Sequence, residues 1–141
     1  MEVLEEIAAF LGAAGLGLTG GSNLFANYLP DVGEQGVAAG PTVALFEYQG
    51  EAPEDTFGTA LPAWEYPRVQ VLIRADTVAA ARDLAVAVAH ALHAVTNQTL
   101  SGALYMRIQM LQRPFFLQRD DHGPTRNVVY ACNFRCHRVP S

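Results

Sequence analysis

Strict alternation of apolar and polar residues in the second half of the chain limits the possible folds more than any other feature of the sequence. Residues 68–75 place valine and isoleucine on one side of a strand and arginine and glutamine on the other. The same alternation returns in 104–111 and 125–139. Such strands bury one face and leave the other polar, as in an antiparallel or mixed sheet covered by helices on one side. The sequence therefore predicts an α+β fold.

Two helices and five strand segments complete this prediction. One helix is expected at 2–14, where acidic residues in the first turns suit the helix dipole, and the other from about 77 to 95, with Asp76 or Thr77 as its N-cap. The buried stripe expected on the second helix is Val78, Ala81, Ala85, Val88, Leu92 and Val95. The strands are expected at 42–48, 68–75, 104–111, 115–119 and 125–139, the last two forming a hairpin that turns at 120–124.

The order of these elements is α-β-β-α-β-β-β, which predicts a sheet of four to five strands with both helices packed on one face. In the strand at 104–111, Leu104, Met106, Ile108 and Met110 should face one way, and Tyr105, Arg107 and Gln109 the other. Two irregular stretches, 15–41 and 49–66, interrupt the pattern and are longer than a compact monomer usually contains. We expect a single domain over 1–141 whose long loops are ordered by a partner subunit.

Charge is divided unevenly along the chain. Residues 1–66 hold ten acidic side chains and no arginine, whereas 67–141 hold nine arginines and four acids, and lysine is absent throughout. A net charge of −5 argues against a generic DNA-binding protein, which needs positive charge. The natural partner for the basic half is the acidic half of a second copy, and head-to-tail contacts of that kind close into rings.

Three motifs that could bind a cofactor or a metal have simpler interpretations. The spacing of Gly15, Gly17 and Gly20 matches a dinucleotide fingerprint, but a helix precedes it where that fingerprint needs a strand. His90 and His93 lie on one helix without a third ligand nearby in sequence. Cys132 and Cys136 lie about 13 Å apart on one strand, too far to bond, and are expected as reduced core thiols. We therefore expect no cofactor and no metal.

The candidate catalytic groups are equally isolated. Ser22 lacks the glycine pattern of a nucleophile elbow. Asp120, Asp121 and His122 precede Gly123 and Pro124, a composition typical of a hairpin turn. The sequence therefore predicts a protein that is not an enzyme.

Targeting signals are also missing from the sequence. The chain opens with Glu2, Glu5 and Glu6, where an export signal needs positive charge. Its longest mainly apolar run, 77–95, contains charged residues and histidines, so it does not read as a membrane span. We expect assembly in a cytoplasm and no membrane partner.

Short sequence patterns along nearly the whole chain resemble the minor capsid or tail terminator proteins of long-tailed bacteriophages. The first half of these patterns is Leu4-Glu5-Glu6-Ile7-Ala8, Gly15-Leu16-Gly17, Asn23-Leu24-Phe25, Leu29-Pro30-Asp31 and Val43-Ala44-Leu45-Phe46-Glu47-Tyr48. The second half is Tyr66-Pro67-Arg68-Val69-Gln70-Val71, Ala80-Ala81-Arg82, Leu100 and Gly102 before Tyr105, Pro114-Phe115, and Arg119-Asp120 before Gly123. Pro124 departs from the family pattern, in which an arginine follows the glycine.

The resemblance implies a structural virion protein at the head-proximal end of a phage tail. Proteins of this family form a hexameric ring on the last ring of tube protein, end tube polymerisation and present the surface that joins the neck of the filled head. The implied partners are other copies of the chain, the major tail tube protein and a neck or head-completion protein. DNA would only pass through the lumen of the ring.

The residues expected at the subunit interface fall into two groups. The acidic stretch contributes Glu51, Glu54, Asp55 and Trp64, and the sheet contributes Arg68, Arg74, Arg107 and Arg135. The acidic stretch at 47–65 could instead line the channel, where it would repel DNA phosphates. Two alternatives to a terminator stay open, namely a head-completion or neck connector protein of the same joint and a host ligand-binding α+β domain.

Overall fold

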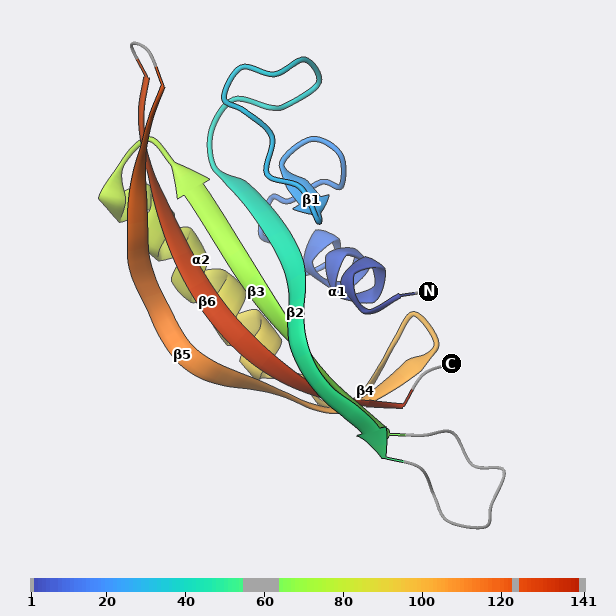
Figure 1. The fold of residues 1–141 in the computed structure, drawn as a ribbon. Coiled ribbons are helices and arrows are strands. Elements are labelled where there is room, and N and C mark those ends of the chain that lie inside the picture. Colours follow the sequence, from blue (N-terminus) through green and yellow to red (C-terminus); the bar gives the residue numbers. More distant parts are fainter. Residues whose placement is uncertain (1, 55–63, 123–124, 140–141) are drawn as a thin grey trace.

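The computed structural model describes residues 2–54, 64–122 and 125–139 and has one curled sheet with two helices (Figure 1). Along the chain the elements are α1 (Val3–Gly12), β1 (Leu24–Ala26), β2 (Thr42–Glu54), β3 (Trp64–Ala75), α2 (Val78–His93), β4 (Thr96–Leu100), β5 (Ala103–His122) and β6 (Thr125–Val139). The fold class is α+β, as the alternation predicts.

The sheet contains six strands in the order β1-β2-β3-β6-β5-β4. The short β1 runs parallel to β2, and every other neighbouring pair is antiparallel. The C-terminal strand β6 therefore lies in the middle of the sheet between β3 and β5. Figure 1 shows that the long strands curl strongly and that the β2–β3 pair extends beyond the helices at one end.

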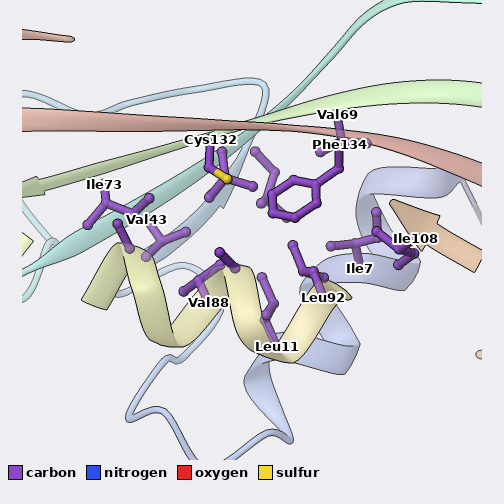
Figure 2. Close-up of a cluster of buried hydrophobic side chains, with 14 of the residues drawn as sticks. Ile7, Leu11, Val43, Val69, Ile73, Val88, Leu92, Ile108, Cys132 and Phe134 are labelled. Atoms are coloured by element: carbon purple, nitrogen blue, oxygen red, sulfur yellow. The ribbon is translucent and has the colours of Figure 1, made fainter. Parts of the chain in front are cut away.

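Both helices pack on the same face of this sheet, as predicted (Figure 2). Side chains such as Val69 and Phe134 point from the sheet toward Leu11 of α1 and Leu92 of α2, and all four are fully buried. Alternate residues of β3 and β6 supply this face because successive strand side chains point to opposite sides. The alternation in the sequence thus predicted which side of each strand carries the core.

The helices differ in small ways from the prediction. Helix α1 ends at Gly12 rather than at 14, and the turn after it uses Gly15, whose positive φ of 77° suits glycine. In α2, Thr77 is the N-cap, and its side chain accepts a hydrogen bond from the Ala80 N–H at 3.1 Å. The expected buried stripe holds except at Val78, which is 42% exposed because it lies at the end of the helix.

The prediction of four to five strands was wrong, since the sheet has six. Strand β1 has three residues inside a glycine-rich stretch, and β4 has the sequence TNQTL with four exposed residues, so neither shows apolar alternation. In contrast, the two segments expected at 104–111 and 115–119 form one long strand, β5. Several register shifts carry β5 past Pro114 without ending its pairing with β6.

One of these irregularities changes a predicted face of β5. Tyr105 and Ile108 are both fully buried, although strict alternation places them on opposite sides. The register shift between Tyr105 and Arg107 inserts one residue, Met106, into the strand. A bulge of this kind moves the side chains that follow it to the other face relative to simple alternation, until the next register shift, which in β5 lies between Met110 and Gln112.

The irregular stretch expected at 49–66 is also shorter than predicted. Strand β2 continues to Glu54 and β3 begins at Trp64, with Glu51 paired to Tyr66 and Glu54 paired to Trp64. The backbone of residues 120–122 likewise belongs to the β5–β6 hairpin, where His122 pairs with Thr125. The hairpin pairing is therefore confirmed, whereas residues 120–122, which were expected in the turn, belong to the strand, and 123–124 lie outside the described residues.

Candidate subunit interface

The face of the sheet opposite the helices, here called the open face, carries the polar half of each alternating strand. It includes Tyr48 on β2, Arg68 and Gln70 on β3, Asn133, Arg135 and His137 on β6, and Gln112 on β5. These side chains form cross-strand rows because their Cα atoms are partners in register. The open face is the surface on which sequence reasoning placed the basic half of the interface.

An aromatic stack occupies the end of the open face near the β2–β3 hairpin. The His137 ring lies 4.4 Å from the Trp64 ring and 4.8 Å from the Tyr66 ring, measured between centroids. The guanidinium carbon of Arg135 lies 4.5 Å from the centre of the Tyr66 ring, a cation–π geometry. Trp64 is half-buried in this stack, so one part of its ring packs on the chain and the rest faces solvent.

Beside the stack, two arginines face each other directly across β3 and β6. Arg68 and Arg135 are register partners, an arrangement that is unfavourable between like charges unless each has other partners. Arg135 contacts the Tyr66 ring, and Tyr48 is the register partner of Arg68 on β2. Burial raises the pKa of the Tyr48 hydroxyl above 10.0, while the charge of Arg68 opposes that rise. Aromatic rings thus flank both cations.

An amide ladder crosses the sheet in the next row. The Gln70 Nε2 donates to the Asn133 Oδ1 at 3.1 Å, and the Asn133 Nδ2 donates to the Gln112 side-chain oxygen. The ladder links β3, β6 and β5 with neutral groups. Amide side chains can both donate and accept, so this row also offers hydrogen bonds to a partner that covers it.

The predicted interface residues are only partly brought together. Arg68 and Arg135 are half-buried on the open face, and Arg107 is exposed on β5 as the register partner of His137. For Glu51 and Glu54 the structure describes the backbone, which places them at the hairpin end of β2, close to Trp64 in register. Asp55 lies outside the described residues.

Arg74 stands apart from the other arginines. It is 5% exposed, and its Nη1 donates to the carbonyl oxygen of Pro30 at 2.5 Å. Arg74 therefore ties the loop between β1 and β2 to the end of β3. A pocket of about 410 Å³ lies beside it, lined also by Thr42, Asp76 and Asn127. The Asn127 Nδ2 in this pocket is buried and has no hydrogen-bond partner.

Sequence reasoning missed the most deeply buried polar cluster, which lies on the helix side of the sheet. Glu6 of α1 is fully buried and accepts from the Arg138 Nε at 2.8 Å and Nη2 at 2.9 Å. The Tyr105 hydroxyl donates to the same carboxylate at 2.7 Å, and the Arg138 Nη1 donates to Glu65 at 2.6 Å. The cluster joins α1, β3, β5 and β6.

The protonation behaviour of this cluster follows from its burial. Burial and the hydrogen bond to Glu6 raise the pKa of Tyr105 well above its usual range. Burial alone would lower the pKa of Arg138, but its bonds to Glu6 outweigh that effect and raise it. A signal was present in the sequence, because Glu6 lies between Val3 and Ile7 on the apolar side of α1, and Arg138 continues the core face of β6 after Cys136.

The motifs that the sequence analysis set aside have structural positions. Gly15 and Gly17, with φ near 77° and 74°, form the turn after α1. The His93 Nδ1 accepts a hydrogen bond from the Met110 N–H at 3.2 Å. Cys132 and Cys136 are free and buried, and burial raises the pKa of each thiol from 9.0 to about 12.

The described residues contain neither a metal-binding cluster nor a membrane-spanning helix. Within 2–54, 64–122 and 125–139, no three or more histidine, cysteine or acidic residues lie close enough together to hold a metal ion. None of the helices in the same ranges has the length and hydropathy needed to cross a membrane.

Comparison with known proteins gives a family match and a structural match that each cover most of the chain. Residues 10–139 match a family model described as bacteriophage tail terminator protein. The fold is similar to that of a chain in the virion of a native gene transfer agent particle, with a TM-score of 0.51 and 17% sequence identity over 95% of this chain and 84% of that chain. At this identity the likeness concerns the fold alone. A search of curated protein sequences found no match.

Proposed function

The chain belongs to the bacteriophage tail terminator family, and from this membership we propose that it caps the head-proximal end of a phage tail tube and ends tube polymerisation. It is a structural protein of a phage tail and a component of the virion. The observation that carries the proposal is the family match over residues 10–139, which include the whole sheet. The proposed function requires only binding to other virion proteins and includes no catalytic step.

We propose that the working form is a ring of identical subunits, with six as the expected number. Two observations support self-association. The chain separates an acidic half from an arginine-bearing half. In addition, the open face presents half-buried arginines and a Trp64 ring that packs on its own chain along only part of its surface. Trp64 is proposed as the aromatic anchor of the subunit contact, with Arg68, Arg107 and Arg135 around it.

The acidic end of the β2–β3 hairpin is proposed to serve the ring in one of two ways. Glu51 and Glu54 lie on the part of β2 that extends beyond the helices (Figure 1), so they can reach a neighbouring subunit. Alternatively, together with Asp55, they line the channel through which DNA passes and repel its phosphates. The two faces of the ring would then bind the last ring of tube protein and a neck or head-completion protein.

Tail length after removal of the gene tests the proposal. Loss of a terminator leaves tube polymerisation unchecked, so electron micrographs should show tails longer and more variable than those of the parent phage. Supplying the intact gene in trans should restore the parental length. Tails of normal length that are not attached to heads would contradict the proposal and would instead identify a head-completion or neck connector protein.

A further inference from the structure

Two strands of the sheet have backbone edges that their neighbours cover only in part. Strand β1 pairs with β2 at residues 43–45, and the Asn27 N–H donates to the Leu45 carbonyl. Among the described residues, no backbone partner lies on this side of β2 from Phe46 to Glu54. This stretch, 46–54, is called the β2 open edge.

The matching stretch on the other side of the sheet belongs to β5. Strand β4 pairs with β5 as far as Arg107, after which Val95 and His93 accept from the N–H groups of Ile108 and Met110. In the part of the chain that the structure describes, the far side of β5 has no further strand neighbour from 111 to 122. This stretch is called the β5 open edge.

The β5 open edge has the character of an interface rather than of a free surface. Residues 111–113 and 116–119 are exposed on both faces of the strand, including Leu111, Phe116 and Leu117 at 39%, 47% and 43%. These are three of the seven exposed large apolar side chains that the structure describes. A strand edge that combines exposed apolar side chains with backbone groups that have no strand neighbour is a template for pairing with another chain.

The charges on the two open edges indicate which chain covers the β5 open edge. The part of the β5 open edge from 111 to 119 carries Arg113 and Arg119, both exposed, and Asp120 and Asp121 follow at its end, whereas the β2 open edge carries Glu47, Glu51 and Glu54 and no basic residue. Because the two edges lie on opposite sides of one sheet, every copy presents one of each. We propose that the β5 open edge of one subunit pairs with the β2 open edge of the next, so that the sheets of neighbouring subunits join into one. This inference rests on the proposed ring and names its contact.

The direction of this pairing follows from the sheet. Strands β2, β3, β6 and β5 alternate in direction, so β2 and β5 run opposite ways. A ring rotation about an axis roughly along the strands preserves these directions. The contact between subunits is therefore antiparallel.

The register of this pairing also follows, because the two open edges lie on opposite halves of the sheet. Phe46, Gln70, Asn133 and Gln112 form one cross-strand row, from which the two edges extend in opposite directions. If one subunit is shifted along the strand direction by about six residues, or about 20 Å, relative to its neighbour, the two open edges lie alongside each other. At that offset Glu47 lies opposite Arg119. The strands are then inclined to the ring axis, as in other closed sheets.

Charge exchange in the full-length protein tests the contact. Glu47→Arg or Arg119→Glu alone should raise the protein concentration needed for assembly at least tenfold, a change equal to about 1.4 kcal/mol, as measured by light scattering. The double variant Glu47→Arg/Arg119→Glu should restore assembly. Arg82→Glu, on the exposed side of α2, is the matched control and should assemble normally. Circular dichroism spectra should show that every variant is folded.

Cross-linking tests the same contact without placing like charges opposite each other. Glu47→Cys combined with Arg119→Cys should give a ladder of disulfide-linked oligomers under mild oxidation, whereas Arg82→Cys with Arg119→Cys should not. The native thiols of Cys132 and Cys136 are buried and should not form disulfides under these conditions. Assembly that is unaffected by the single charge changes, with no ladder, would overturn the edge pairing.

The test of the edge pairing can be separated from the test of the proposed function. A protein that controls tail length but assembles through another surface would keep the proposed function and lose this inference. A ladder formed only with the tail tube protein would also overturn it, since the β5 open edge would then bind a different chain.

Discussion

At the scale of single residues, the ion pair between Glu6 and Arg138 has the largest expected effect on stability. It is buried on both sides and connects the first helix to the last strand. Taking two charges out of water is costly, and the cost is offset only while each charge keeps its partner. The cluster also gives Tyr105 its acceptor, so loss of the carboxylate affects two buried groups.

Replacement of Arg138 alone should therefore be strongly destabilising. We expect Arg138→Met to lower the free energy of unfolding by about 3–5 kcal/mol, because Glu6 is left as an unpaired buried charge. The measurement is urea unfolding followed by circular dichroism. The double variant Glu6→Leu/Arg138→Met should regain part of the loss, since no buried charge remains. A single variant as stable as the parent protein would contradict this account of the cluster.

At the scale of elements, α2 depends on its first residue and on its alanines. Ala81, Ala85 and Ala89 are buried against the sheet, so small side chains allow the helix to lie close to the strands. The helix begins at a side-chain cap on Thr77, which satisfies one of the amide groups left free in the first turn. No acidic residue lies in that first turn to interact with the helix dipole, so the Thr77 cap is the side-chain interaction that stabilises the start of the helix.

Loss of this cap should have a measurable effect. Thr77→Ala is expected to lower the free energy of unfolding by about 1 kcal/mol, because the Ala80 N–H loses its acceptor. Thr77→Ser keeps a hydroxyl in place and should stay close to the parent value in the same urea titration. Equal loss in both variants would show that the threonine methyl group, and not the hydrogen bond, matters.

The elements also show how far sequence reasoning reaches. Alternation identified β3 and β6 and their buried faces, because a long strand with one covered face has apolar residues at every second position of its sequence. It could not find β4, whose residues are polar and mostly exposed, or β1, whose three residues are too few for a period. The bulge at Met106 was likewise invisible, since backbone hydrogen bonding and not side-chain type decides where a strand slips.

The surroundings of the proposed interface residues were harder to predict than the strands. The sequence placed Arg68, Arg74 and Arg135 on one polar face, and that placement agrees with the register. Their surroundings depend on chain segments that meet only in the folded protein. The loop carrying Pro30 covers Arg74, whereas Tyr66 lies beneath Arg135. Residue type and period alone therefore could not separate a buried arginine from an accessible one.

At the scale of the whole molecule, the open face and the two open edges belong to the same extended sheet. The helices cover only one side of it, so the polar rows of the open face and the two strand edges are available for assembly. Trp64 lies where the hairpin end of β2 and β3 meets the end of β6, stacked on His137. A neighbour that covers this region would bury the rest of the Trp64 ring.

The contribution of this ring to assembly can be measured directly. If Trp64 anchors the proposed subunit contact, Trp64→Ala should raise the concentration needed for assembly about thirtyfold, as expected for the loss of about 2 kcal/mol. Light scattering across a dilution series provides the measurement. Tyr28→Ala, which removes an exposed aromatic ring from the β1–β2 loop, is the matched control. Unchanged assembly and tail length in the tryptophan variant would remove the anchor.

The central position of β6 has a consequence for the synthesis of the protein. A chain leaving the ribosome releases α1, the hairpin and α2 before the strand that must lie between β3 and β5. Until β6 is made, β3 and β5 lack their shared neighbour, and Glu6 lacks Arg138. Prematurely ended chains therefore miss the middle of the sheet and cannot present two joined edges. Such fragments lack both the finished sheet and the buried ion pair, so we expect them to be substrates for proteolysis.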